Sequence, residues 1–355
     1  MKKVYQFLPG FSVGDAVSNY ALDLSGILED LGYASGIYSD YEHTSESLKD
    51  CCEPYTNYSR VAGADDILLY HYGVGSPVSQ FLLHQPGKLV LIYHNITPAH
   101  FFEAIDRPRA EILNEGRTRL TLLKDRCSLA LGVSEYNRIE LQEMGFQHTA
   151  VLPLYLDVSR FNVEADKDVF NRNQGVFSII SVGRIAPNKR LEDTIRIFYF
   201  LRKSAYPLGR LFLIGSFGGM NKYQQHLDEF SRRLDLLPEV VFPGHVTDAK
   251  LKAYYQIASA YVCTSEHEGF CLPLLEAMYF NVPVFACDSA AIPETLGGSA
   301  VLLHDKRPEY IAEIITGVLQ DKILVKQICA SQQKRWQIFS KSHIATVLEK
   351  YLLSL

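Results

Sequence analysis

Short apolar runs alternate with amphipathic segments along the chain, and this rhythm predicts an α/β fold with parallel sheets. In the first half, we expect strands buried on both faces at residues 4–8, 35–38, 67–70, 88–93, 129–133 and 149–152. Helical patterns separate these strands at residues 17–31, 107–126 and 135–144. Strands that alternate with helices in this way form doubly wound sheets.

The second half repeats the rhythm after a polar segment, residues 162–175, that has little periodicity. Strands are expected at residues 176–182, 211–214, 240–242, 260–264, 284–286 and 300–303, with helices at 191–203, 223–234, 248–257, 272–279 and 309–319. We therefore predict two doubly wound, Rossmann-like domains, at residues 1–165 and 170–340. One more amphipathic helix is expected at residues 342–355, and its apolar side requires a partner.

Composition narrows the class of protein. The 355 residues suffice for about two domains of ~150 residues, and the net charge of -5 excludes a chain-wide basic field for nucleic acid. Apolar runs stay below the ~18 residues of a membrane-spanning helix. The apolar stretch that opens the chain is too short for a signal peptide, and the seven cysteines contain no CxxC pair. We therefore expect a cytoplasmic protein without a disulfide framework or a zinc site.

Two loops of the first half fit a ligand site, because ligands of parallel sheets bind beyond the carboxyl ends of the strands. Residues 9–15 follow the first strand, and Gly14 there would let the backbone approach a phosphate. An ordinary connecting loop is the alternative. His94 directly follows the strand at residues 88–93, which makes it a ligand candidate, although a lone histidine is more often structural.

Two loops of the second half carry more charge. Arg184 and Lys189 lie five residues apart after a strand and before a helix, an arrangement that suits a diphosphate. Glu268 and Glu276 lie eight apart around Gly269 and could accept hydrogen bonds from sugar hydroxyls. A solvated loop acid and a helix-terminal carboxylate are the structural alternatives.

Two further signals are discounted. The acidic pair within residues 166–168 has the spacing of a metal-chelating motif, but we expect it to be solvated linker. The glycines of residues 215–219 lack the GxGxxG order of a dinucleotide fingerprint.

These residues resemble the retaining, family 4 glycosyltransferases, which have the GT-B fold. The resemblance spans residues 176–304 and rests on Glu268-x7-Glu276, Gly183-Arg184 with Lys189, Pro243-Gly244-His245-Val246, and Val282-Pro283-Val284 before Ile292-Pro293-Glu294. The first domain is similar more loosely, at Gly14 and His94. The resemblance implies two Rossmann-like domains that face each other across a cleft, with the last helix packed back on the first domain.

Residue by residue, the resemblance implies a sugar nucleotide held mainly by the second domain, with the acceptor on the first. Arg184 and Lys189 would hold the diphosphate and stabilise the leaving nucleotide, while Glu268 and His94 would contact the donor sugar. The remaining donor-binding residues would be Gly14, His245, Val246, Gly269, Phe270, Cys271, Leu272 and Glu276. No metal ion and no cofactor is expected, because fixed cations would offset the diphosphate charge.

The segment at residues 93–102 looks like that of bacterial mannosyltransferases of surface-polysaccharide assembly. We therefore expect transfer of mannose from GDP-mannose to a glycan or lipid-linked oligosaccharide. A UDP-sugar donor, a sugar-nucleotide epimerase and a non-enzymatic sugar-binding protein are the alternatives.

Residues 106–126 carry six basic and four acidic side chains among leucines and an isoleucine. Such a helix could lie on the inner face of the cell membrane, where a lipid-linked acceptor would be. A solvated amphipathic helix is equally compatible with the pattern.

Overall fold

The computed structural model describes residues 2–355 and divides the chain into two compact units. Unit 1 comprises the residues up to Glu103, Arg107–Tyr155 and Phe339–Leu355, and unit 2 comprises Ala104–Asp106 and Leu156–Ile338. The chain thus leaves the first unit at residue 155, ten residues before the boundary that we expected at 165.

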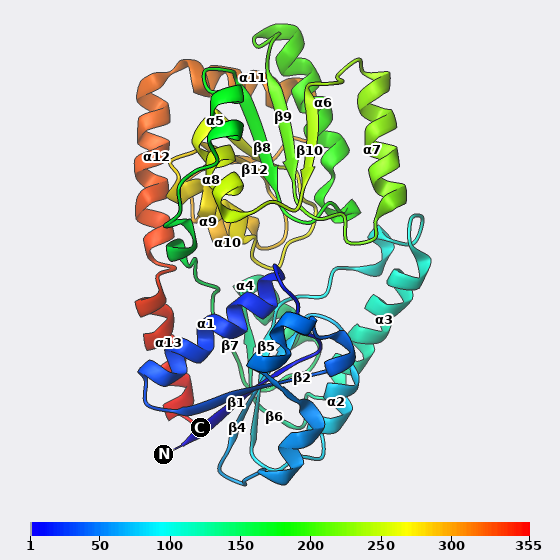
Figure 1. Ribbon diagram of the computed structural model, residues 1–355, viewed down its shortest axis with the longest axis vertical. Coiled ribbons are helices and arrows are strands. Elements are labelled where there is room, and N and C mark those ends of the chain that lie inside the picture. The colour runs from blue at the N-terminus through cyan, green and yellow to red at the C-terminus, as the bar shows by residue number, and fades with distance from the viewer. Residues whose placement is uncertain (1) are drawn as a thin grey trace. The chain divides into compact units, whose positions relative to one another are not determined.

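Unit 1 is built on a seven-stranded sheet in the order β3-β2-β1-β4-β5-β6-β7, in which every neighbouring pair is parallel (Figure 1). The strands are β1 (Lys3–Leu8), β2 (Ala34–Ser39), β3 (Glu53–Pro54), β4 (Ile67–Tyr72), β5 (Lys88–Tyr93), β6 (Cys127–Gly132) and β7 (Thr149–Val151). All of β4 is buried, because helices and loops cover both faces of the central strands. The α-helices are α1 (Ala16–Asp30), α2 (Pro77–Leu82), α3 (Arg107–Thr121), α4 (Glu135–Glu143) and α13 (Lys341–Leu353), with 3-10 turns η1 (Tyr41–His43), η2 (Glu46–Cys51), η3 (Tyr55–Arg60) and η4 (Ala99–Phe101).

The last helix, α13, belongs to unit 1 and packs against α1. Its apolar side, Ile344, Leu348 and Leu352, is buried. The hydroxyl of Tyr351 also donates a 3.0 Å hydrogen bond to the carbonyl of Val151 in β7. The apolar face that lacked a partner in the sequence is therefore covered by the first unit.

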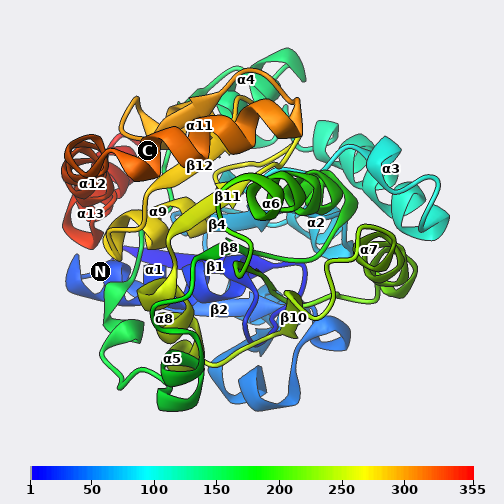
Figure 2. The same ribbon diagram turned by 90° about the horizontal axis from the view of Figure 1, so that it is seen from above.

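Unit 2 is built on a six-stranded parallel sheet in the order β10-β9-β8-β11-β12-β13. The strands are β8 (Ser178–Val182), β9 (Arg210–Ile214), β10 (Val240–Gly244), β11 (Ala260–Cys263), β12 (Val284–Cys287) and β13 (Val301–Leu303). The helices are α5 (Lys167–Asn173), α6 (Leu191–Ser204), α7 (Asn221–Arg233), α8 (Asp248–Ile257), α9 (Leu272–Tyr279), α10 (Ile292–Leu296), α11 (Pro308–Gln320) and α12 (Lys322–Gln337), with 3-10 turns η5 (Val158–Phe161) and η6 (Pro187–Lys189). Helix α11 packs against α6, and α12 packs against α9 (Figure 2).

Two expectations for this half were wrong. Asp166 is not solvated linker: its carboxylate accepts a 2.9 Å hydrogen bond from the backbone N–H of Val169 and caps α5. Helix α12 was not expected, because it has no continuous apolar stripe; its Ile323 is exposed, and polar Gln332 is its buried residue.

Across residues 2–355, no helix combines the length and apolar character needed to cross a bilayer.

Candidate active site

One edge of the unit 2 sheet gathers the loops that carry most of the predicted site residues. Strands β10, β9, β8 and β11 lie side by side and parallel, so the loops that follow them emerge at the same edge. These loops hold His245 after β10, Arg184 and Lys189 after β8, and Glu268 after β11.

A buried ion pair joins two of these loops. The ammonium of Lys189, at the end of η6, donates to Oε1 of Glu268, 79 residues further along the chain. The same oxygen accepts a 2.7 Å hydrogen bond from the hydroxyl of Ser265. The side chains of Lys189 and Glu268 are 17% and 10% exposed, so each charge depends on the other for compensation.

The charge of Glu268 keeps Lys189 protonated. Burial lowers the pKa of Lys189, but the negative charge of Glu268 outweighs this, so the pKa lies above its usual value. The site therefore holds a permanent positive charge at neutral pH.

Both members of the pair retain hydrogen-bonding capacity. Within residues 2–355, Oε2 of Glu268 has no hydrogen-bond partner, and it is not among the fully buried polar atoms that lack one. The ammonium of Lys189 has three N–H groups, of which the contact with Glu268 uses one. A ligand at this edge could therefore donate to Glu268 and accept from Lys189.

Hydrogen bonds to backbone carbonyl oxygens hold the two loops together. The hydroxyl of Thr264, just after β11, lies 3.0 Å from the carbonyl oxygen of Lys189 and 2.9 Å from that of Arg190. The side-chain amide of Asn188 donates to the carbonyl of His267 at 3.0 Å, and the N–H of Glu266 donates to the carbonyl of Asn188 at 2.8 Å. The position of Lys189 relative to Glu268 thus follows from the pairing of β8 with β11.

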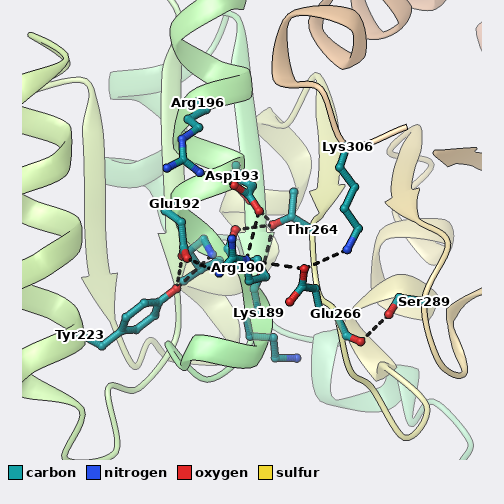
Figure 3. Close-up of polar contacts among 12 residues, drawn as sticks. Lys189, Arg190, Glu192, Asp193, Arg196, Tyr223, Thr264, Glu266, Ser289 and Lys306 are labelled. Atoms are coloured by element: carbon teal, nitrogen blue, oxygen red, sulfur yellow. Dashed lines mark hydrogen bonds and ion pairs between the residues drawn. The ribbon is translucent and has the colours of Figure 1, made fainter. Parts of the chain in front are cut away.

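A cluster of charges beside the pair supports this arrangement, and Figure 3 shows Arg190 at its centre. Nη1 of Arg190 lies 3.0 Å from Glu192, and its Nε lies 3.3 Å from Asp193 and 3.8 Å from Glu266. The hydroxyl of Tyr223 donates to Glu192 at 2.6 Å. Sequence reasoning missed these residues, although Arg190 directly follows Lys189.

Arg184 and Lys189 differ in environment. Arg184 is exposed, and a side chain added at Gly218 would meet its Cδ at 3.5 Å, so the arginine runs along the loop that follows β9. Gly183 has φ +140°, and a Cβ there would lie 3.3 Å from Nζ of Lys189. A larger residue at position 183 would therefore crowd the ammonium as well as strain the backbone.

Glu276 lies inside α9, and each of its carboxylate oxygens has one protein partner. The hydroxyl of Tyr255 donates to its Oε2 at 2.7 Å, and Nη1 of Arg160 lies 3.3 Å from its Oε1. Burial raises the pKa of Glu276, and the charge of Arg160 and the hydrogen bond from Tyr255 oppose this only in part. Arg160 also contacts Asp248, the first residue of α8. Sequence reasoning did not single out either partner.

Two cysteines meet at Glu268. The sulfurs of Cys263 and Cys271 and a carboxylate oxygen of Glu268 all lie within 4.8 Å of one another. A hydrogen bond from Cys271 lowers the pKa of Cys263, and the same bond raises that of Cys271. These three groups could ligate a soft metal ion, but the carboxylate is already paired with Lys189.

The remaining predicted donor-binding residues lie at the same edge. Cys271 has φ +73° and directly precedes Leu272, the first residue of α9, so the loop that carries Gly269 and Phe270 turns sharply at Cys271 before the helix begins. His245 is exposed and Val246 is partly buried; both follow Gly244, whose φ is +74°. Their roles toward a nucleotide stay predictions.

The candidates of unit 1 lie at the carboxyl ends of its own strands. Gly14 has φ +76° in the exposed loop before α1, which Asp15 caps. His94 directly follows β5, and its Nε2 lies 3.0 Å from Nδ1 of buried His71. Burial lowers the pKa of His94 to about 3, so this histidine is neutral.

Residues 106–126, which contain helix α3, offer less apolar surface than their sequence pattern indicates. Leu120 and Leu123 are buried, and Leu113 packs against the core of unit 1, which leaves Ile112 and Leu122 exposed. The arginines of α3 are also engaged: Arg117 contacts Glu140, and Arg119 contacts Glu115 at 2.6 Å. Membrane contact through residues 106–126 stays a prediction.

Comparison with known proteins identifies the family of the segment that holds most of the site residues. Residues 162–335 match the family of glycosyl transferases group 1, and they include the Lys189–Glu268 pair. Residues 162–335 form a group 1 glycosyltransferase domain. The predicted resemblance of this segment to glycosyltransferases is thereby confirmed.

Two curated relatives of this chain are named as mannosyltransferases. The serotype-specific mannosyltransferase WbdA of Escherichia coli is 24% identical over 203 residues, which are 54% of this chain and 23% of that protein. The O-antigen chain mannosyltransferase B of E. coli is 28% identical over 140 residues, 39% of this chain and 36% of that protein. The matches thus span well under half the length of each relative.

Solved structures confirm the α/β fold class. Sucrose-phosphate synthase (tll1590) from Thermosynechococcus elongatus superposes with a TM-score of 0.77 at 15% identity, covering 99% of both chains. HepE from Anabaena, solved in complex with UDP-glucose, gives a TM-score of 0.75 at 17% identity, covering 99% of this chain and 100% of that one. The two Rossmann-like, parallel-sheet units are those of the GT-B fold.

Proposed function

We propose that this protein transfers a hexose from a sugar nucleotide to a glycan or lipid-linked acceptor in bacterial polysaccharide biosynthesis. The observation that carries the proposal is the buried contact between Lys189 and Glu268 inside the group 1 glycosyltransferase domain. GDP-mannose is the favoured donor, and the names of the relatives support mannose as the transferred sugar. The reaction is proposed to retain the anomeric configuration and to need no metal ion.

Lys189 is suited to stabilise the negative charge of the leaving group. Cleavage of the bond between the sugar and the diphosphate leaves extra negative charge on the phosphate oxygens. A fixed cation in a water-poor site stabilises that charge more strongly than water does. Lys189 is positively charged and mostly buried, and it has N–H groups left to donate. Arg184 follows the same strand and would serve as a second, more exposed cation.

Glu268 is suited to the sugar. Its Oε1 accepts from Lys189 and Ser265, which leaves Oε2 to accept from a sugar hydroxyl. A carboxylate that is held by two donors on one oxygen cannot turn away when the sugar binds. The pair would thus align the hydroxyls and the departing phosphate in one site.

Glu276 is proposed to bind the ribose, with the backbone of residues 269–272 near the sugar and phosphate and that of residues 244–246 near the base. Because Tyr255 and Arg160 already hold both oxygens of Glu276, it would accept ribose hydroxyls through its remaining lone pairs. The roles of Gly14 and His94 toward the donor are proposals of the same kind.

The decisive experiment measures sugar-nucleotide turnover in EDTA with GDP-mannose and UDP-hexoses in parallel. We expect GDP-mannose to be transferred or slowly hydrolysed at an unchanged rate when the chelator is present. Absence of turnover with every common donor would count heavily against the proposal. Turnover that EDTA abolishes would overturn metal independence alone.

A thermal-shift screen separates the alternatives, because a ligand that binds the folded protein raises its melting temperature by mass action. Stabilisation by GDP and GDP-mannose supports the favoured donor, whereas stabilisation by UDP and UDP-sugars moves the assignment to a UDP-sugar enzyme. Conversion of the donor without an acceptor would indicate an epimerase. Binding of a sugar without its nucleotide would indicate a sugar-binding protein.

A further inference from the structure

Three polar side chains form a chain of hydrogen bonds across the interior of unit 1. They are Gln6 on β1, His71 on β4 and His94 just after β5, on three strands that are adjacent in the sheet. The register pairs Gln6 with Leu69 and His71 with Ile92, so all three lie on the same face. Gln6 and His71 are fully buried.

The direction of the first hydrogen bond follows from Gln6. Its Nε2 lies 2.9 Å from the carbonyl oxygen of Ala21 and 2.8 Å from the hydroxyl of Ser25, both in α1. A carbonyl oxygen can only accept, so the amide nitrogen faces α1 and Oε1 faces His71. Oε1 likewise can only accept. Nε2 of His71, 2.9 Å away, must therefore carry a proton.

The direction of the second hydrogen bond follows from His71. Its surroundings are uncharged: within residues 2–355, no carboxylate or cationic side chain hydrogen-bonds to either imidazole, and the ring of Tyr20 packs edge-on against both. A neutral imidazole carries one proton, which His71 has on Nε2, so its Nδ1 is an acceptor. Nε2 of His94, 3.0 Å from that Nδ1, must then be the donor.

We infer that Gln6 and His71 fix His94 in the tautomer protonated on Nε2, which leaves its Nδ1 as a hydrogen-bond acceptor at the carboxyl end of β5. In the described part of the chain this Nδ1 has no partner, and it is not among the fully buried atoms that lack one. It selects a ligand group that can donate, such as a hydroxyl, and disfavours a group that can only accept, such as a phosphate or carbonyl oxygen.

Gln6 and His71 are thus positioning residues for His94. The tautomer of His94 follows from the hydrogen bonds alone, whereas the identification of its partner as a sugar hydroxyl rests on the proposed function. The two can therefore fail separately. Loss of glycosyltransferase activity says nothing about the tautomer.

Nitrogen NMR of the 15N-histidine-labelled full chain tests the inference without any ligand, because protonated and unprotonated ring nitrogens have well-separated chemical shifts. His94→Gln identifies the signals of His94 among the 11 histidines. We expect a protonated Nε2 and an unprotonated Nδ1 for His94 between pH 6 and 8. The reverse pattern, or a doubly protonated ring, would overturn the inference.

Matched variants test the role of the positioning residues. His71→Asn offers an amide oxygen close to the place of Nδ1, so His94 should keep its single tautomer. His71→Leu removes the acceptor of the His94 hydrogen bond, and Gln6→Leu removes the group that fixes the tautomer of His71. His94 should then show both tautomers. The backbone spectrum of unit 1 shows whether each variant is folded. If His94 keeps one tautomer in both leucine variants while they remain folded, Gln6 and His71 do not position it.

Discussion

The two units carry different kinds of polar groups at the carboxyl ends of their parallel strands: a charged pair in unit 2 and neutral groups in unit 1. In unit 2, the carboxyl edge holds a positive ammonium against a negative carboxylate, Lys189 and Glu268. In unit 1, the corresponding edge holds the neutral imidazole of His94, and neutral His71 and the amide of Gln6 lie behind it within the strands. Each set is mostly shielded from water, so burial by itself does not decide whether a group is charged.

The difference lies in the neighbours. Burial lowers the pKa of Lys189, His71 and His94 alike, but a carboxylate contacts only the lysine among them. The lysine therefore stays charged and the histidines stay neutral. Lys189 in unit 2 can stabilise a developing negative charge, whereas the Gln6–His71–His94 chain in unit 1 can supply directed hydrogen bonds.

The largest expected effect is the loss of one member of the charged pair. Lys189→Ala or Glu268→Ala should lower turnover at least about tenfold, or ~1.4 kcal/mol of barrier. Each should also lower the free energy of unfolding of unit 2 by about 3 kcal/mol, because the remaining charge is buried without compensation. Steady-state kinetics and urea unfolding measure the two effects.

The double variant Lys189→Ala/Glu268→Ala is the control. It should recover part of the stability, since no lone charge remains, but none of the turnover. Near-normal turnover in both single variants would contradict the assignment of the site.

The next effect is the response of unit 1 to acid. Below pH ~6.5 the unfolded chain protonates His71 and His94, while the folded unit keeps them neutral, His94 down to a pKa of about 3. The unfolded state then binds more protons, so stability falls by about 1.4 kcal/mol per pH unit for each histidine as the pH drops through this window. Above pH ~6.5 the contribution is complete and constant.

Hydrogen exchange of β4 and β5 amides between pH 7 and 5 measures this slope, after correction for the intrinsic pH dependence of exchange. His94→Gln should reduce it, whereas replacement of exposed His343 by glutamine should not. An equal slope in the wild type and in His94→Gln would show that His94 titrates normally.

A smaller effect is expected from loss of the Tyr223 hydroxyl, which contacts Glu192 in the cluster around Arg190. The hydroxyl of Tyr223 donates to Glu192 and accepts a 3.2 Å hydrogen bond from the N–H of Leu191. Tyr223→Phe removes one partner of Glu192, which keeps its contact with Arg190, and leaves the buried N–H of Leu191 unsatisfied. It should lower the free energy of unfolding of unit 2 by about 1–3 kcal/mol. Turnover should fall less than in Lys189→Ala. An unchanged denaturation midpoint would mean that water replaces the hydroxyl.

The smallest effect is expected at the exposed margin of the same cluster. Lys306 contacts Glu266 at 2.9 Å, but its side chain is 55% exposed. Lys306→Ala should change the free energy of unfolding by less than about 1 kcal/mol and leave turnover unchanged. A loss comparable to that of Tyr223→Phe would show that Glu266 depends on Lys306 rather than on Arg190.

Much of this organisation could be predicted from local patterns. The apolar runs at residues 67–70 and 88–93 indicated buried strands, and both lie in the centre of the unit 1 sheet. The loops that follow strands indicated where Lys189 and Glu268 would lie. Such patterns report whether a segment is buried and where it ends, and both properties are local.

The contacts of the site could not be predicted in that way. Cys263 meets Cys271 because the backbone turns at Cys271, whose φ is +73°. Non-glycine residues seldom adopt this angle, and no sequence pattern predicted it here. Arg160, which contacts Glu276, lies just before the polar segment at residues 162–175, where the sequence predicted no element of the site. Helix α12 lacked the apolar stripe that would have predicted it.

By itself the sequence determined the α/β class, the strand ends at which ligands can bind and the family resemblance, because periodicity and motif spacing are properties of the chain. Only the tertiary structure decided that Lys189 meets Glu268 and that Gln6, His71 and His94 form one chain of hydrogen bonds. Those contacts depend on which strands become neighbours. The charge of each group then depends on what surrounds it after folding, since burial and a nearby opposite charge act on its pKa in opposite directions.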